Sequence, residues 1–170
     1  MKQKLPQRRS DCPITFALDL FGDKWTLLVL RDLIIVGKRH FREFLVSDEK
    51  IASNILASRL KLLEAAGMLT RRPDPESARQ VIYEPTEKGL DLIPSMLELV
   101  RWSAKYDPRT AAPPPLVRRI AKDREGFAAE IRSSAIKATG ASQKLVPAGA
   151  VPSRKSGLAQ NARAKTRAWR

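Results

Sequence analysis

Apolar residues recur at helical spacing through the first two thirds of the chain and predict a mainly helical domain. The expected helices cover residues 13–21, 24–36, 41–45, 51–66 and 86–106. Gly22 and Gly37 end the first two, and Asp23 can cap the second. Pro94 should kink the long last helix or loosen its first turns, because proline removes a helical N–H.

The stretch from Ile51 to Gly67 separates an apolar side from a polar side when it is placed on a helix. The apolar side holds Ile51, Leu56, Leu60 and Leu63. The opposite side, which has no acidic residue, holds Ser53, Asn54, Ala57, Ser58 and Lys61. Such a face can lie against a polyanion and reach base edges, although most helices with an apolar stripe only pack against a core. A short helix, a polar turn and this helix, in that order, indicate a helix-turn-helix.

Two short runs of strand formers follow and predict a β-hairpin. The runs are residues 68–72 and 80–84, and the loop between them, residues 73–79, contains two prolines. Arg71, Arg72 and Arg79 place three guanidinium groups on this hairpin. A glycine stop and then a basic strand is the order expected of a recognition helix followed by a wing.

The C-terminal third has a different composition. Residues 107–115 are a Pro- and Ala-rich hinge, and Leu116, Ile120, Phe127 and Ile131 then recur at helical spacing up to about residue 138. Residues 140–170 contain seven basic residues, no acid and few large apolar groups, so we expect this tail to be disordered.

Charge is concentrated in that third. The net charge is +14, of which residues 109–170 supply +11, from 14 basic and 3 acidic residues. This excess favours a nucleic acid or an anionic surface as partner. No apolar run reaches the roughly 18 residues that a membrane span needs, and no cleavable leader is recognised. We therefore expect a cytoplasmic, nucleoid-associated protein that does not bind membranes and needs no cofactor.

Short motifs at fixed spacing run from about Cys12 to Trp102. They are Cys12-Pro13, residues 18–26, 37–44, 56–60, 63–68 and 83–89, and Trp102. In content and order they resemble the HxlR-type winged helix-turn-helix transcriptional regulators of bacteria. The resemblance covers roughly half the chain. It implies a homodimer that binds a palindromic operator through two winged helices and is joined through the first and last helices of the domain.

The expected fold class is therefore mainly α with a small β-hairpin: a homodimeric winged helix-turn-helix with a C-terminal helical extension and a disordered basic tail. The expected domains are a flexible basic arm (1–10), a DNA-binding and dimerisation domain (11–107), a hinge with an amphipathic helix (108–139), and the tail (140–170). Three residues depart from the family pattern. Ala52 stands where a capping Ser is usual, so that Ser53 must cap or the helix end frays; His40 stands where Arg is usual; and Pro85, in place of Leu, should shorten the second wing strand.

Candidate DNA contacts fall into two groups. On the recognition helix they are Ser53, Asn54, Ser58, Arg59 and Lys61, with Arg59 interpreted as either a phosphate contact or an intradomain ion pair. On the wing and for the DNA backbone they are Lys38, Arg39, Arg42, Arg71, Arg72 and Arg79. The alternative is an ordinary solvated side chain for Ser53, Asn54, Ser58 and Lys61, and a solvated hairpin for Arg71, Arg72 and Arg79.

Apolar residues in excess of what one small domain can cover indicate a homodimer. The expected interface consists of Ile14, Phe16, Leu18, Phe21, Leu97, Val100 and Trp102.

Cys12, the only cysteine, has two interpretations. It is a reactive thiol at a helix N-terminus that senses oxidants or electrophiles, or it is a small buried hydrophobic residue, which we slightly favour.

The sequence favours a dimeric, sequence-specific DNA-binding regulator, most simply a repressor, with an electrophile or a small molecule as candidate effector. The alternative is an architectural DNA- or RNA-binding protein in which the basic tail dominates. His40, the only histidine, has no partner at metal-ligand spacing, so no metal site is expected. No nucleophile–base pair, paired carboxylates or Gly-rich phosphate loop suggests an enzyme.

Overall fold

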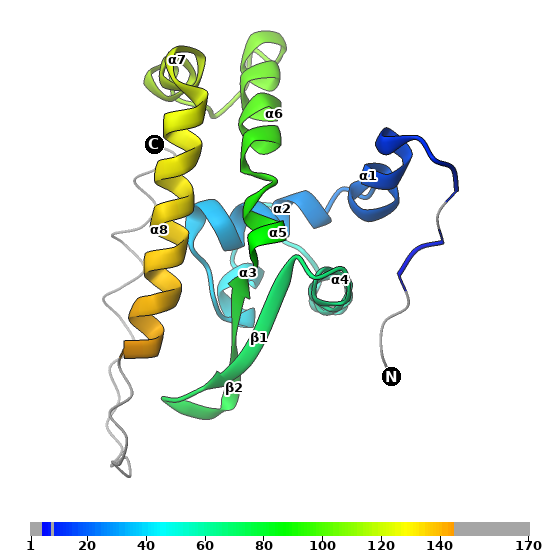
Figure 1. Ribbon diagram of the computed structural model, residues 1–170, viewed down its shortest axis with the longest axis vertical. Coiled ribbons are helices and arrows are strands. Elements are labelled where there is room, and N and C mark those ends of the chain that lie inside the picture. Colours follow the sequence, from blue (N-terminus) through cyan, green and yellow to red (C-terminus); the bar gives the residue numbers. More distant parts are fainter. Residues whose placement is uncertain (1–4, 8, 145–170) are drawn as a thin grey trace. The chain divides into compact units, whose positions relative to one another are not determined.

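The computed structural model of the protein describes residues 5–7 and 9–144 (Figure 1). The expectations for residues 1–4, for residue 8 and for most of the tail, 145–170, therefore lie outside the described residues. The chain divides into two compact units, the first ending at Leu92 and the second beginning at Ile93. The first unit contains the helix-turn-helix and the hairpin, and the second is helical.

The first unit begins with three helical segments. They are α1 (Pro13–Phe21), α2 (Thr26–Arg31), which continues as the π-helical turn η1 (Asp32–Val36), and α3 (Phe41–Leu45). Helix α2 begins two residues later than expected, with Trp25 at its N-cap, and the carboxylate of Asp23 accepts hydrogen bonds from the backbone N–H groups of Trp25 and Thr26 at 2.8 and 3.1 Å. Gly37 has a left-handed φ of 82° and ends η1.

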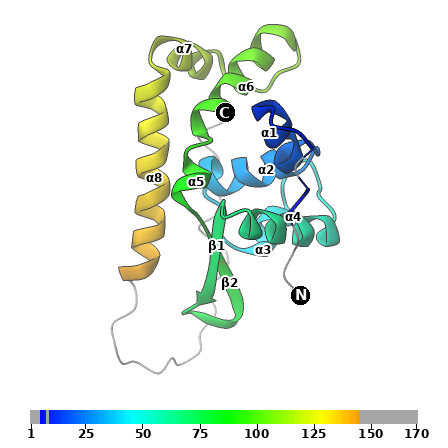
Figure 2. The same cartoon turned by 45° about the vertical axis from the view of Figure 1, so that its right-hand side comes forward.

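Helix α4 (Ser53–Ala65) supplies the apolar wall that closes the core of this unit. In Figure 2, α4 lies below α2 and to one side of the hairpin. Leu56 and Leu63 of α4 are fully buried, as are Leu30 and Leu33 of the second helix and Phe44 of α3. Phe44 also meets Tyr83 of the hairpin edge-on, with ring centroids 6.2 Å apart. The core therefore fixes which side of α4 faces outward.

The hairpin is longer and its turn tighter than the sequence predicted. Strand β1 (Leu69–Asp74) pairs antiparallel with β2 (Ser77–Pro85), so the predicted loop 73–79 is wrong. Asp74 makes the short turn, because its carboxylate accepts a hydrogen bond from the backbone N–H of Glu76 at 2.9 Å. Both strands are edges of a two-stranded sheet, where a proline such as Pro73 is tolerated. Pro85 is the last residue of β2 and pairs with Leu69.

The predicted helix 86–106 is two helices, α5 (Glu87–Leu90) at the end of the first unit and α6 (Ile93–Tyr106) in the second. Pro94 has no N–H to bond to Leu90, so one continuous helix would lose a bond there. Thr86 caps α5, since its side chain accepts from the N–H of Gly89. The missing N–H of Pro94 thus interrupts the helix completely, whereas the sequence predicted a kink or loosened first turns.

The second unit consists of α6, α7 (Pro114–Lys122) and α8 (Arg124–Lys144), each of which contacts the other two. The single helix predicted up to residue 138 is therefore wrong. Asp123 leaves the helical conformation, with φ −151° and ψ 77°, and its carboxylate accepts the N–H of Gly126 at 2.8 Å. Helix α8 runs to Lys144, so the first five residues of the tail predicted to be disordered are helical.

Candidate nucleic-acid interface

Helix α4 turns a polar, acid-free side to solvent. Ser53, Asn54 and Lys61 are exposed, and Ser58 is half-buried at the edge of this side. Leu56 and the other apolar residues on the opposite side are buried. The helical spacing therefore predicted the orientation of α4 correctly. We call Ser53, Asn54, Ser58 and Lys61 the α4 face.

The start of α4 has no side-chain cap. Its N-cap is Ala52, and Ser53 is the first helical residue, so the expectation that Ser53 caps the helix is wrong. The turn before it holds Lys50 in a left-handed conformation, with φ 52°, and exposes its side chain. Sequence reasoning missed this lysine as a candidate contact, although its place between α3 and α4 was a usable signal. The first turn of α4 thus presents N–H groups and a basic residue to an anion.

Arg59 lies on the flank of α4 and forms an ion pair. Its guanidinium nitrogen Nη1 is 3.3 Å from Oδ2 of Asp23, whose carboxylate also accepts hydrogen bonds from the backbone at the start of α2. Burial alone would raise the pKa of Asp23, but hydrogen bonds from Thr26 and Trp25, together with the charge of Arg59, lower it below its usual range. Of the two readings of Arg59, the structure shows the intradomain ion pair.

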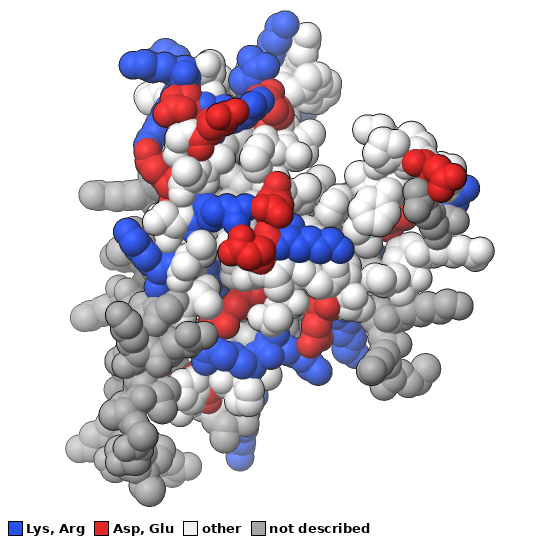
Figure 3. Space-filling model, in the orientation of Figure 1, with Lys and Arg blue, Asp and Glu red and all other residues white. Residues whose placement is uncertain are grey.

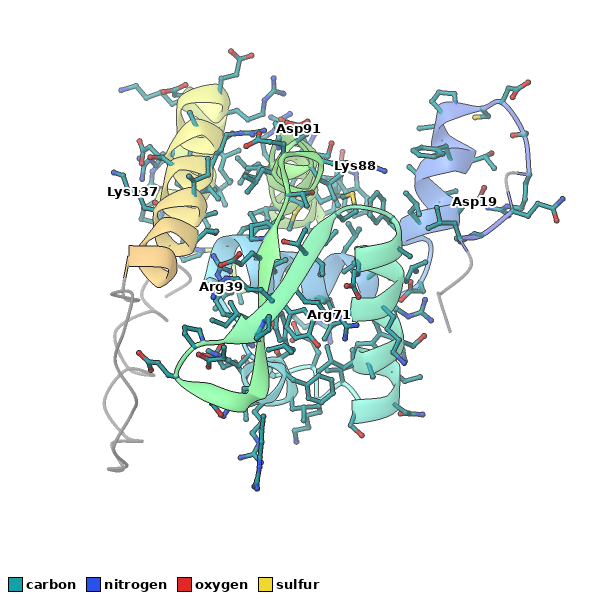
Figure 4. The ribbon with its side chains drawn as sticks, turned by 60° about the horizontal axis from the view of Figure 1, so that its bottom comes forward. Asp19, Arg39, Arg71, Lys88, Asp91 and Lys137 are labelled. Carbon is teal, nitrogen blue, oxygen red and sulfur yellow. The ribbon has the colours of Figure 1, made fainter. Side chains whose placement is uncertain are left out.

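The basic segment that precedes α3 is largely used inside the protein. Lys38 donates through Nζ to Asp32, at 2.8 Å, and to Ser47. Arg39 is only 8% exposed, and its guanidinium donates to the backbone carbonyls of Leu33 and Lys38. Figure 4 shows Arg39 lying against the hairpin. The expectation that Lys38 and Arg39 clamp a phosphate is therefore wrong, because Lys38 already bonds to Asp32 and Ser47 and the guanidinium of Arg39 is buried. Arg42 is exposed.

The hairpin arginines differ in exposure. Arg79 is exposed, and so is Arg71, which lies between the hairpin and α4 and donates to Glu64 at 3.0 Å (Figure 4). Arg72 is half-buried and donates through two nitrogens to the buried Glu84. Figure 3 shows basic side chains over the hairpin with acidic ones among them. Arg71 and Arg79 therefore remain accessible to a partner, and Arg72 serves mainly to hold β2.

Several of the expected interface residues are exposed in the single chain. On α1, Ile14, Phe16 and Leu18 are 66%, 51% and 53% exposed, whereas Phe21 is half-buried. On α6, Trp102 is 64% exposed and packs against Tyr106 with ring centroids 5.4 Å apart. Val100 is half-buried. Leu97 is 1% exposed, so its expected place in an interface is wrong and it belongs to the core.

Cys12 is exposed at the N-cap of α1. The backbone N–H groups of Thr15 and Ile14 approach the sulfur and lower the pKa of the thiol below its ordinary value. The favoured reading of Cys12 as a small buried hydrophobic residue is therefore wrong.

His40 contacts the hairpin rather than a metal-ligand cluster. Its Nε2 lies 3.0 Å from Oδ2 of Asp74. Among the residues that the structure describes, no three His, Cys, Asp or Glu side chains gather in a way that could hold a metal ion. No helix in the described part of the chain is long and apolar enough to span a membrane.

Comparison with known proteins decides the family. Residues 20–111, more than half of the chain, match the HxlR-like helix-turn-helix family. The chain belongs to the HxlR-like helix-turn-helix family. The match ends before α7, so α7 and α8 lie outside the family region.

Relatives of this HxlR-like protein are helix-turn-helix regulators. The HTH-type transcriptional regulator Mb3122 of Mycobacterium bovis is 37% identical over 98 residues, which are 58% of this chain and 61% of that protein. YdeP of Bacillus subtilis is 36% identical over 58% of this chain and 76% of its own length. The chain thus matches less than two thirds of the length of its mycobacterial relative.

Solved structures show the same winged-helix fold. The crystal structure of PA1607 aligns with a TM-score of 0.54 at 34% identity, over 61% of this chain and 72% of that one. The redox regulator HypR in its reduced form aligns with a TM-score of 0.52 at 31% identity, over 57% of this chain and 95% of that one.

Proposed function

We propose that this chain is a DNA-binding transcriptional regulator that places α4 in a major groove. The observation that carries the proposal is the α4 face, which is polar, free of acid and held outward by the buried leucines behind it. A helix of this kind fits the width of the major groove and meets base edges there. The regulator names of its relatives support the same function.

Base reading and backbone contact are assigned to different residues. Asn54 and Lys61 are exposed and can donate to base edges, with Ser53 and Ser58 beside them. Arg42, Arg71 and Arg79 are exposed basic residues of α3 and the wing, and they contact phosphates. Lys38, Arg39 and Arg72, which are buried or bonded within the chain, have no part in this interface.

The operator is a palindrome bound by a homodimer. Exposed apolar side chains on α1 and on α6 form two surfaces that a second copy would cover, as Ile14 and Trp102 illustrate. Two copies related by a two-fold axis present two α4 helices, and a palindrome mirrors that symmetry. Light scattering at micromolar concentration should give twice the chain mass; a monomer at that concentration would reject the dimer.

The regulator is a repressor, and oxidation of Cys12 controls its release from the operator. Its exposed, acidified thiol is the chemical form that attacks oxidants, and the similar structure HypR is named a redox regulator. Diamide would join the Cys12 thiols of two copies in a disulfide, with two electrons and two protons passing to diamide. Operator release by diamide should be lost in Cys12→Ser; identical release in both proteins would remove the sensor assignment.

DNase footprinting on the promoter region next to the protein's own gene tests the central proposal. A discrete palindromic footprint is expected, and Asn54→Ala with Lys61→Ala should lower the preference for that site by roughly 1–3 kcal/mol. The matched control is Lys105→Ala, which removes an exposed lysine from α6. Uniform coating would favour the alternative, non-specific binding through the +11 charge of residues 109–170.

A further inference from the structure

The tip of the hairpin is tied to the start of α3 by one pair of side chains. His40 Nε2 lies 3.0 Å from Oδ2 of Asp74, which is the last residue of β1. The other oxygen of Asp74 accepts the N–H of Glu76 and forms the turn. Asp74 thus serves the hairpin and its attachment at once. Its side chain is 11% exposed, so the attraction between an imidazolium and this carboxylate is only partly screened by water.

A second carboxylate holds the other side of His40. The Glu43 side chain accepts hydrogen bonds from the backbone N–H groups of Arg39 and His40, and its Oε2 is 3.7 Å from Nδ1 of the His40 ring. The backbone carbonyl of Arg39 in turn accepts the N–H of Tyr83 in β2. The imidazole therefore sits between two acids at the point where α3 meets both strands.

The other charged groups of the hairpin are engaged elsewhere or point to solvent. Arg72 and Glu84 bond to each other, and Arg71 bonds to Glu64 of α4. Glu76 and Arg79 are exposed. On the α3 side, Lys38 bonds to Asp32, Arg39 is buried and Arg42 is exposed. Asp74 and Glu43 are thus the acids within ion-pair distance of the ring among the described residues.

We propose that His40 and Asp74 form a pH-sensitive latch that fixes the wing against α3. Imidazole is the side chain that changes charge between pH 5 and 8. Below that change, the imidazolium donates through Nε2 to Asp74 and its charge also attracts Glu43, so the hairpin tip is held. Above it the charge attraction is lost and the tip opens more often. The latch therefore holds at low pH and weakens as pH rises.

The effect of the latch on DNA affinity rests on the proposed function, because it requires that the chain binds DNA. The latch itself can be tested on the free, full-length protein. His40 is the only histidine, so its ring signals in an NMR titration need no assignment by mutation. Amide protection factors at Glu76 and Ser77 report how often the turn opens. They can be compared between pH values because they are corrected for the pH dependence of intrinsic exchange.

Between pH 5.5 and 8 these protection factors should fall about two- to fivefold, the scale of a partly exposed ion pair. His40→Gln and Asp74→Asn should both flatten this response. Asp74→Asn retains an oxygen that can accept the Glu76 N–H, so the turn can still form. Glu76→Gln is the matched control, since it removes one negative charge from the same turn and should keep the wild-type response. A flat wild-type profile, or a full response in Asp74→Asn, would overturn the latch.

Affinity for a fixed 30-base-pair duplex, measured at constant ionic strength across the same pH range, gives the second readout. It should fall with rising pH in the wild type and in Glu76→Gln, but not in Asp74→Asn. Simple attraction of charged His40 to phosphates would persist in Asp74→Asn, and that result would overturn the latch as the cause. If the duplex does not bind at any pH while the turn still responds, the latch stands and the proposed function fails.

Discussion

The α4 face and the segment that precedes α3 contain similar polar and basic side chains, but the protein uses them differently. Lys61 on α4 extends into solvent, whereas Lys38 and Arg39 turn inward to Asp32 and to backbone carbonyls. The difference lies in what surrounds each lysine or arginine. η1 places the buried Asp32 within reach of Lys38, whereas the α4 face has no acid of its own.

Net charge along a stretch is therefore a poor measure of charge that a partner can reach. The three basic residues at positions 38, 39 and 42 present one accessible cation, Arg42. Lys38 instead bonds to Asp32 of η1, and Arg39 bonds to the backbone carbonyl of Leu33 and is attracted by the charge of Glu84 in the hairpin. Substitutions of Lys38 and Arg39 should therefore lower stability, whereas substitutions on the α4 face should lower DNA binding.

The largest effect is expected from Arg39→Met, a change that removes the buried guanidinium and keeps much of its volume. The carbonyl of Leu33 would lose its Arg39 donor, and Glu84 would lose a neighbouring charge that attracts it. We expect the free energy of unfolding to fall by about 2–4 kcal/mol. Nε and Nη2 of Arg39 are buried without partners, which favours the lower end of that range. Urea denaturation measures the change.

Arg42→Met is the matched control, because it makes the same substitution at an exposed arginine of α3. It should change the free energy of unfolding by less than about 0.5 kcal/mol. Equal stability of the two variants would show that the buried guanidinium does not stabilise the fold, and the contrast between the two basic regions would fail.

The sequence predicted well what depends on near neighbours. The bounds of α1 follow from Pro13 and Gly22, and the outward side of α4 follows from the spacing of its leucines. The hydrophobic pattern and the family motifs together predicted the winged-helix fold. These features are local because one helical turn and its caps decide them.

The features that the sequence did not predict depend on partners distant in the chain or on single backbone bonds. Arg39 bonds to a carbonyl six residues away and lies under a hairpin some forty residues later, which no pattern of charges reveals. Asp74 closed a turn that two prolines made look like a long loop. Cys12 is exposed at the start of α1, which also exposes Ile14, Phe16 and Leu18, and only tertiary packing decides which residues of a helix are covered.

A smaller effect is expected for DNA binding when Arg42 and Lys38 are compared. Arg42→Ala should weaken binding to all duplexes and reduce the dependence of log affinity on log salt by about 0.9, the amount for one phosphate on B-DNA. Lys38→Ala should leave that slope unchanged, because Lys38 already bonds to Asp32 and Ser47. Fluorescence anisotropy between 50 and 200 mM salt measures both slopes. An equal reduction in both variants would place Lys38 on the DNA after all.

The smallest effect concerns Arg31, a further basic residue that the protein uses internally. Its guanidinium donates to both oxygens of Glu49, at 2.6 and 3.0 Å, and also to Asp32. The hydrogen bond from Arg31 lowers the pKa of Glu49, against the opposing effect of burial. A carboxyl whose pKa is lower in the folded state stabilises the fold above its unfolded pKa, near 4.3, and loses that contribution as pH falls below it.

Glu49→Gln should therefore be less stable than the wild type at pH 7 and approach it at pH 3.5. Because the Glu49 side chain is about a third exposed, the difference at pH 7 should be only about 0.5 kcal/mol. Urea midpoints at the two pH values measure it, with Asp48→Asn, at an exposed neighbouring acid, as the control. A difference that is the same at both pH values would mean that the shape of Glu49, and not its charge, supports Arg31. The charge of Glu49 would then not be the reason why Arg31 faces inward while Lys61 faces solvent.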